Sequence, residues 1–250
     1  DIACRICAIC STSHRLAAIR GLEKALDIKV DEGTERLREL WHIGEMIESH
    51  ALHVFLLALP DLLNFPSAIS MAERYPEEVK MGLSLKKFGN RIMETVNARM
   101  IHGKNAVLGG FGKRPSEGEL LRLGRDAPRL IPSAERAIEL LASLKLPSHW
   151  DEESIFMCLE PKEGFGFVGD TVVISDDERK SVEEYKSLTN EITVPYSFAK
   201  RSHFHGRPFF VGALARLLLL GDRLVGRTAE WFSRTYNEEW KKNPIYNNLA

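Results

Sequence analysis

Apolar residues recur at helical spacing along most of the chain. The pattern predicts helices over residues 13–26, 34–59, 76–99, 116–144 and 211–232. Thr34 is expected to cap the second helix, Pro60 to end or kink it, and Pro76 to open the third. Pro128 and Pro132 are expected to interrupt the fourth. These amphipathic segments indicate a core built mainly of helices.

A different pattern follows in the second half of the chain, where short runs of β-branched and aromatic residues are typical of strands. The runs cover residues 155–159, 165–168, 171–175 and 192–194. We therefore expect a mainly α fold with a small antiparallel β-sheet (α+β), the β insertion lying at about residues 155–195. The 250 residues are expected to form a single domain, 1–250.

The charge balance gives no electrostatic argument for binding nucleic acid or an anionic membrane, because 34 basic residues face 35 acidic ones and the formal net charge is -1. The longest apolar stretches are shorter than the roughly 20 residues that span a bilayer, so no segment is expected to cross a membrane. The N-terminus has neither an initiator Met nor a secretory leader, and a truncated start is expected.

Three of the four cysteines, Cys4, Cys7 and Cys10, lie within ten residues of the start, and Cys158 stands alone. A disulfide framework would be spread along the chain. Closely spaced thiols without an export signal indicate a metal-binding or redox-active site in a reducing compartment, which predicts a cytoplasmic protein. Cys158 is interpreted as a thiol of the core.

The cysteine cluster contains two overlapping ligand spacings. Cys4, Cys7 and Cys10 together resemble part of a ferredoxin-type iron-sulfur site, which would need another cysteine where this chain has His14. A structural zinc site would need two further ligands at short spacing. The other spacing is Arg5-x-Cys7-x-x-Cys10-x-x-x-His14, in which two thiolates chelate a soft metal and His14 donates an N–H to a coordinating sulfur.

The second spacing has a close parallel in a known family. The string R-I-C-A-I-C-S-T-S-H resembles the first cysteine motif of nickel-iron hydrogenase large subunits, R-x-C-G-x-C-x-x-x-H, with Ala8 where Gly is commoner. The likeness continues nearly to the end of the chain, through residues 48–53, 59–61, 101–111, 211–216 and 243–250. His102-Gly103 departs from the His-Pro that the family usually has there.

The resemblance implies a role for each matching residue. Cys7 would be a terminal nickel ligand and Cys10 a nickel-iron bridge, with Arg5 and His14 framing the pair and His14 hydrogen-bonded to a bridging sulfur. Asp61 matches the family's carboxylate beside the open metal site. An α-helix of eleven residues would bring Asp61 to within about 20° of His50.

His50 and His53 are three residues apart and could be mistaken for a pair of metal ligands. The interpretation favoured here is that both are buried polar residues, hydrogen-bonded near the site.

The resemblance also implies an activity and its cofactors: reversible heterolytic cleavage of H2 at a nickel-iron centre with carbonyl and cyanide ligands. Electrons would pass to a small subunit that carries the iron-sulfur clusters, and NAD(P)- or flavin-binding subunits are further partners. The amino-acid sequences of these motifs look most like those of soluble cytoplasmic hydrogenases linked to NAD(P) or sulfur reduction. The family's Ala-Pro-Arg-Gly motif and its C-terminal Asp-Pro-Cys-x-x-Cys motif are absent. The chain is therefore interpreted as a fragment, the alternative being that another chain provides the missing half.

Two alternatives come from other classes of protein. The quinone-side subunit of respiratory complex I is related to this family but binds no nickel, and it lacks the paired cysteines. A ferredoxin-like or zinc-binding module would use Cys4, Cys7, Cys10 and His14.

Overall fold

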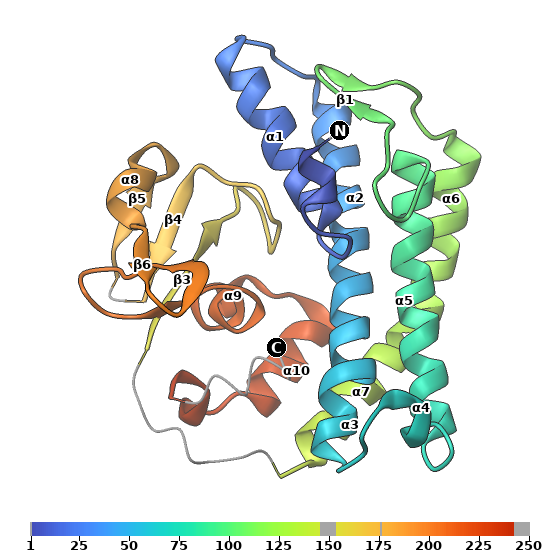
Figure 1. Ribbon diagram of the computed structural model, residues 1–250. Coiled ribbons are helices and arrows are strands. Elements are labelled where there is room, and N and C mark those ends of the chain that lie inside the picture. The colour runs from blue at the N-terminus through green and yellow to red at the C-terminus, as the bar shows by residue number, and fades with distance from the viewer. Residues whose placement is uncertain (1, 146–153, 176, 243–250) are drawn as a thin grey trace. The chain divides into compact units, whose positions relative to one another are not determined.

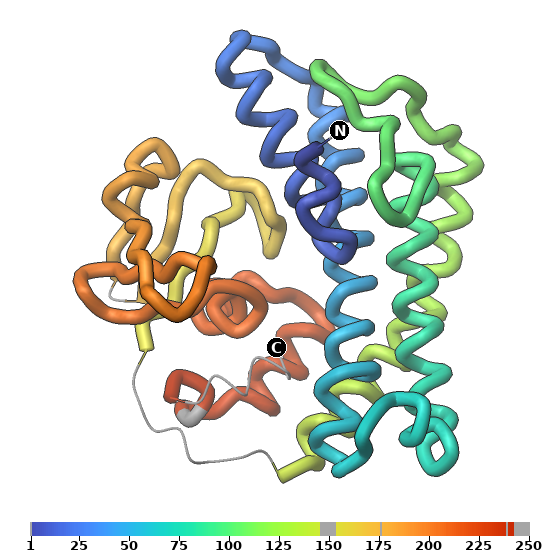
Figure 2. Tube along the Cα trace, in the orientation of Figure 1, coloured from blue at the N-terminus to red at the C-terminus, as the bar shows by residue number. Residues whose placement is uncertain are grey.

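The computed structural model describes residues 2–145, 154–175 and 177–242, and the chain divides into two compact units, Asp1–Leu141 and Ala142–Ala250 (Figures 1 and 2). The first unit is mainly helical and the second holds most of the strands. The fold class expected from the sequence, mainly α with a small sheet, is therefore confirmed. The single domain expected over residues 1–250 stays a prediction.

The first unit is built around two long helices, α2 and α5, which pack side by side along their length (Figure 1). Its elements are α1 (Ser11–Ala25), α2 (Glu32–Leu52), α3 (Leu59–Leu62), α4 (Ala68–Met71), α5 (Pro76–Asn97), β1 (Ala106–Val107), β2 (Gly110–Phe111), α6 (Glu117–Asp126) and α7 (Ile131–Ser143). Pro76 occupies the first turn of α5, as predicted. The expected interruption of the fourth helix is a 3₁₀ turn at Ala127–Leu130.

Two glycines allow α2 and α5 to approach closely. A Cβ atom at Gly89 would lie 2.5 Å from the Gly44 carbonyl oxygen, and one at Gly44 would lie 2.8 Å from Ile92 Cγ2. Beyond this contact the two helices and α1 share a core of buried apolar side chains. The cluster comprises Leu16, Ile19, Trp41, Met93, Val96 and Ala106. Helix α2 is thus held firmly on two sides.

The second predicted helix differs from expectation at both ends. Asp31, not Thr34, caps α2, because its carboxylate accepts the Thr34 N–H at 2.7 Å. The regular helix stops at Leu52, and a π-helical segment, His53–Ala58, connects it to α3. Pro60 lies in the first turn of α3, where its missing N–H is tolerated, so it does not end the helical run.

The second unit holds a four-stranded sheet with the order β5-β4-β3-β8. Its elements are β3 (Ile155–Glu160), β4 (Thr171–Ile174), β5 (Arg179–Ser181), α8 (Tyr185–Leu188), β6 (Ile192–Val194), β7 (Ser197–Arg201), β8 (Phe209–Phe210), α9 (Ala213–Leu220) and α10 (Gly226–Thr235). The β3–β4 and β4–β5 pairs are antiparallel as expected, whereas β8 lies parallel to β3. Strand β3 is buried on both faces, Ile155 and Phe156 belonging to different clusters. Cys158 is buried in β3, as expected for a core thiol.

Two expectations for the second unit are wrong. Residues 165–168 form no strand, because the Arg216 side chain binds backbone carbonyls and an aromatic ring of this segment. Arg216 Nη2 donates to the carbonyl oxygens of Phe165 and Gly166 at 2.9 and 2.8 Å, and its guanidinium lies 4.1 Å from the centre of the Phe167 ring. The helix expected over 211–232 is divided into α9 and α10.

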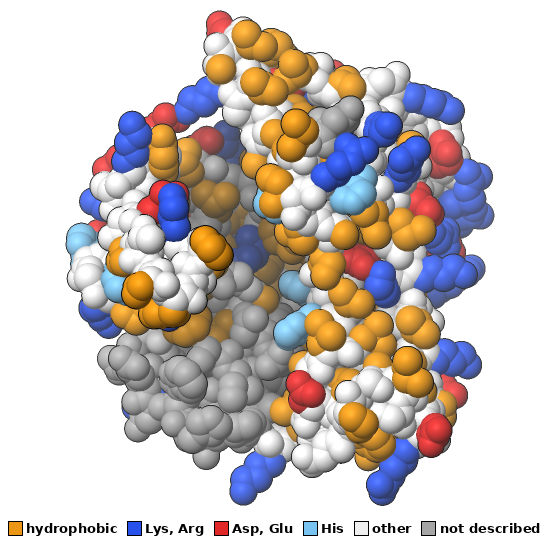
Figure 3. All heavy atoms as spheres, viewed as in Figure 1, with side chains coloured by type: hydrophobic (Ala, Val, Ile, Leu, Met, Phe, Trp, Pro, Cys, Tyr) orange, Lys and Arg blue, Asp and Glu red, His pale blue; other side chains and the backbone are white. Residues whose placement is uncertain are grey.

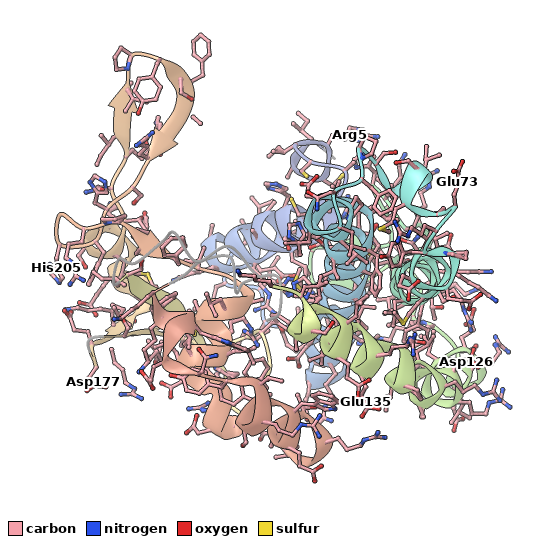
Figure 4. The ribbon with its side chains drawn as sticks, turned by 90° about the horizontal axis from the view of Figure 1, so that it is seen from below. Arg5, Glu73, Asp126, Glu135, Asp177 and His205 are labelled. Atoms are coloured by element: carbon pink, nitrogen blue, oxygen red, sulfur yellow. The ribbon has the colours of Figure 1, made fainter. Side chains whose placement is uncertain are left out.

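Strands β6 and β7 form a separate hairpin, which extends away from the sheet at the upper left of Figure 4. Every residue of β7 is exposed. In the part of the chain that the structure describes, no helix combines the length and the apolar character needed to span a membrane. On the face seen in Figure 3, hydrophobic side chains are spread over the surface of the first unit, and Lys and Arg gather at its edge beside α5 and α6.

Candidate metal centre

The three N-terminal cysteines belong to the short segment that precedes α1 along the chain, drawn in dark blue in Figure 2. The loop begins with a 3₁₀ turn, Ala3–Arg5, in which the Ile6 N–H donates to the Ala3 carbonyl at 3.2 Å. Cys10 occupies the position directly before the first residue of α1, Ser11. The Arg5 side chain is exposed at the surface (Figure 4).

Cys7 and Cys10 are brought together, as the C-x-x-C spacing predicts. The pKa of the Cys7 thiol is lowered, because its sulfur accepts hydrogen bonds from the Cys10 N–H, the Cys10 thiol and the Ile9 N–H. The pKa of Cys10 is raised to about 11, because its thiol donates a hydrogen bond to the Cys7 sulfur and is partly desolvated. The pair therefore favours a thiolate on Cys7, which is the form of cysteine that binds metals.

Cys4 is separate from this pair. Its side chain is only 2% exposed, and its sulfur lies 4.0 Å from Arg15 Nη1. Among the described residues there is no group of three or more His, Cys, Asp or Glu side chains that could together hold a metal. The geometry thus supplies two thiols of a metal site but does not assemble the ferredoxin-type or zinc set that would include Cys4 and His14.

His14 lies one helical turn after Cys10, and its backbone N–H donates to the Cys10 carbonyl at 3.2 Å. Its side chain is half-buried. In the described part of the chain that side chain makes no hydrogen bond to the sulfur of Cys7 or Cys10. The bond expected from the family resemblance stays a prediction.

Glu45 of α2 is a functional candidate that the sequence reasoning missed. Its carboxylate caps the N-terminus of α1: Oε2 accepts the Thr12 N–H at 2.6 Å, and Oε1 accepts the Ser13 N–H at 3.1 Å and the Ser13 hydroxyl at 2.5 Å. The side chain is fully buried, and burial raises the pKa of Glu45 although these donors act to lower it. The sequence does contain one indication of this role: Glu45 is an acidic residue on the same face of α2 as Trp41 and Gly44, the face that the apolar spacing predicts to be buried.

A second anchor holds the loop from the segment after α5. His102 Nδ1 lies 2.6 Å from the Cys4 carbonyl oxygen, so this nitrogen carries the donated proton. Its backbone N–H donates to Ser11 Oγ at 3.4 Å, and its φ of 52° lies in the left-handed region. Arg15 Nη2 donates to the Ala106 carbonyl at 2.7 Å, which ties α1 to the same segment.

Asp61 is exposed on α3. Among the residues that the structure describes, it does not form a possible metal site together with Cys7 and Cys10. The expected helical phase between His50 and Asp61 is wrong, because the π-helical segment between them has more residues per turn than an α-helix. His50 and His53 are both exposed, so their expected burial is also wrong. The role proposed for Asp61 stays a prediction.

Comparison with known proteins identifies relatives along the whole chain. The family described as nickel-dependent hydrogenase matches residues 1–111. The alpha subunit of sulfhydrogenase 2 from Pyrococcus furiosus is 42% identical over 100% of this chain and 58% of its own length. The alpha subunit of sulfhydrogenase 1 from the same organism is 39% identical over 98% of this chain and 58% of its own length.

A solved structure has the same fold. An NAD+-reducing [NiFe]-hydrogenase in its H2-reduced state superposes with a TM-score of 0.85 and 26% identity, covering 99% of this chain and 62% of that chain. The present chain thus spans less than two thirds of the length of each of these proteins.

Proposed function

Because this chain belongs to the nickel-dependent hydrogenase family, we propose that it is part of a hydrogenase large subunit that catalyses reversible heterolytic cleavage of H2. The observation that carries the proposal is the hydrogen-bonded pair of Cys7 and Cys10 at the start of α1. No feature of the site favours the quinone-side subunit of complex I, which lacks paired cysteines.

The donor set fits a soft metal. Thiolates select soft or borderline ions, and the N–H groups around Cys7 stabilise the charge that such a ligand needs. In this proposal Cys7 and Cys10 would hold the nickel-iron centre, and His14 would donate an N–H to one of the coordinating sulfurs. Among the described residues, no third His, Cys, Asp or Glu side chain joins Cys7 and Cys10 in a metal-holding group, and the remaining thiolates of the proposed centre would be supplied by other protein.

When bound, the nickel-iron centre, with carbonyl and cyanide ligands on the iron, would supply the activation of H2. The chain's own residues would handle the proton. As the terminal ligand of the centre, Cys7 Sγ would be a candidate to accept it. Asp61, exposed on α3, would hold water and protons at the open side of the centre, and Arg5 would provide the positive charge flanking the cysteines.

The proposal includes partner subunits. The chain has four cysteines, and two of them are assigned to the centre, so too few remain for an iron-sulfur relay. Electrons would therefore leave through clusters in a small subunit. NAD(P)- or flavin-binding subunits are proposed as further partners, supported by the name of a relative, the NAD-reducing hydrogenase HoxS subunit beta of Cupriavidus necator. A cytoplasmic location stays part of this proposal.

Elemental analysis and hydrogen uptake of the full-length protein test the proposal together. The expected result is nickel and iron in the purified protein and reduction of an artificial electron acceptor under H2. Zinc alone, or iron without nickel, would support a metal-binding module of another kind, and either result without H2 turnover would falsify the proposed function.

A further inference from the structure

We propose that Glu45 is a positioning residue for the cysteine pair, its carboxylate fixing the first turn of α1 and thereby the direction in which Cys10 presents its sulfur. The inference rests on the proposed function and deepens it, because it assigns the support of the metal site to a side chain of α2. Three contacts carry it, all from one carboxylate to two consecutive residues of α1.

Helix α1 has no side-chain cap at the residue directly before it. A helix begins with N–H groups that have no partner within the helix, and a Ser, Thr, Asp or Asn directly before it usually accepts one of them. In α1 that position is Cys10, whose side chain makes no capping hydrogen bond. Cysteine is also not among the residue types that commonly cap a helix. Glu45 supplies the missing acceptor from 33 residues away in the sequence.

The Glu45 carboxylate is buried and both of its oxygens are hydrogen-bonded. Glu45 is 0% exposed, and a carboxylate is costly to bury unless its oxygens are hydrogen-bonded. Both oxygens of Glu45 are bonded to α1: Oε2 to the Thr12 N–H at 2.6 Å, and Oε1 to the Ser13 N–H at 3.1 Å. A bidentate contact fixes direction as well as distance, so the first turn of α1 cannot rotate without breaking one of these bonds.

The backbone that carries Glu45 is held by close packing of α2 against α5. Glu45 directly follows Gly44, where α2 packs tightly against α5: a Cβ at Gly89 would lie 2.5 Å from the Gly44 carbonyl oxygen. Thr12 is also tied to α5, since its hydroxyl lies 3.7 Å from Met93 Sδ. Glu45 therefore acts from a backbone that is itself fixed, which is what a support for a metal ligand requires.

The test compares Glu45→Ala and Glu45→Gln in the full-length protein with a matched control, Glu48→Gln. Glu48 is the neighbouring buried carboxylate on α2, and it pairs with Lys86 rather than with α1. Glutamine retains one oxygen that can accept an N–H, whereas alanine retains none. We expect Glu45→Ala to lower nickel content or H2 uptake by about 10- to 100-fold, Glu45→Gln to lower them less, and Glu48→Gln to leave both near wild type.

Two readouts separate positioning from a general loss of structure. In loaded enzyme, the infrared bands of the iron-bound carbonyl and cyanide should shift in Glu45→Gln but not in Glu48→Gln. In metal-free protein, alkylation of Cys10, followed by mass spectrometry, should be faster in Glu45→Ala than in wild type or Glu48→Gln.

Wild-type nickel content, bands and alkylation rate in Glu45→Ala would overturn the inference. Equal effects of Glu45→Ala and Glu48→Gln on all readouts would also overturn it, because they would indicate a shared loss of stability. If wild-type protein bound no nickel, the proposed function would fail, and the alkylation rates would still decide whether Glu45 positions Cys10.

Discussion

Arg38 and Glu23 form a bidentate ion pair between α2 and α1. Arg38 Nη1 donates to Glu23 Oε2 at 2.8 Å and Nη2 donates to Oε1 at 2.6 Å, with both side chains buried. Glu23 Oε1 also accepts the Gly109 N–H at 2.8 Å, so the pair joins the two helices to the β1–β2 turn.

Removing one member of this pair should be more harmful than removing both. Arg38→Met leaves a buried carboxylate without its partner, and we expect it to lower the free energy of unfolding by about 3–5 kcal/mol. Glu23→Leu combined with Arg38→Met should cost less, because neither charge remains. Chemical denaturation of the two variants and wild type provides the measurement. A double variant at least as unstable as Arg38→Met would contradict the prediction.

The same carboxylate predicts a dependence of stability on pH. Burial acts to raise the pKa of Glu23, but hydrogen bonds from Arg38 and Gly109 outweigh it, and the folded-state pKa is lowered. A lowered pKa stabilises the fold above the unfolded value of about 4.3, and that contribution is lost as the pH falls through the folded value. The stability gap between wild type and Glu23→Gln should therefore be full at neutral pH and shrink in acid. A constant gap across the titration would count against it.

Substitution of individual cysteines should separate the nickel site from the three-thiol alternatives. Cys7→Ser should reduce the nickel content of the full-length protein to background, because it removes the thiol that favours the thiolate form. Cys4→Ala should retain wild-type nickel, since Cys4 is buried beside Arg15 and lies outside the pair. Metal analysis of both variants provides the comparison, and loss of nickel in Cys4→Ala would bring Cys4 back as a ligand.

Glycines in two helices should respond in opposite directions to the same substitution. A Cβ at Gly82 of α5 would lie 2.4 Å from Phe55 Cβ, so Gly82→Ala should destabilise the protein by about 1–3 kcal/mol. Gly21 of α1 has no neighbouring atom within 4 Å of that position, and Gly21→Ala should stabilise it by about 0.5–1 kcal/mol through helix propensity. Thermal unfolding measures both effects. Equal shifts of the unfolding temperature, with the same sign in both variants, would show that the close contact at Gly82 does not determine the effect of the substitution.

The sequence predicted what depends on neighbours along the chain. Helices α1 and α5 follow from apolar spacing and Pro76, and the Cys7–Cys10 pair follows from its two-residue separation. Features that depend on distant residues were not predictable in this way. Residues 165–168 have strand-forming side chains, yet Arg216 takes the Phe165 and Gly166 carbonyls that a strand would pair.

The cap that Glu45 provides for α1 also depends on residues that are distant in the sequence. Nothing near Cys10 in the sequence indicates that its helix is capped by Glu45, because the acceptor comes from another helix. Only the position of an acidic residue on the buried side of α2 could have suggested it. Exposure of His50 and His53, and the π-helical segment after Leu52, likewise depend on packing that apolar spacing does not encode.

The π-helical segment His53–Ala58 also affects how the chain tolerates changes in length. Such segments accommodate an extra residue within a helix. Deleting one residue there would restore regular α-helical geometry more easily than a deletion inside α2, so the fold itself could survive it. Asp61 would keep about the same direction relative to α2, because a π-helical turn holds more residues than an α-helical turn for the same rotation. The same deletion inside α2 would instead turn Asp61 by about 100°.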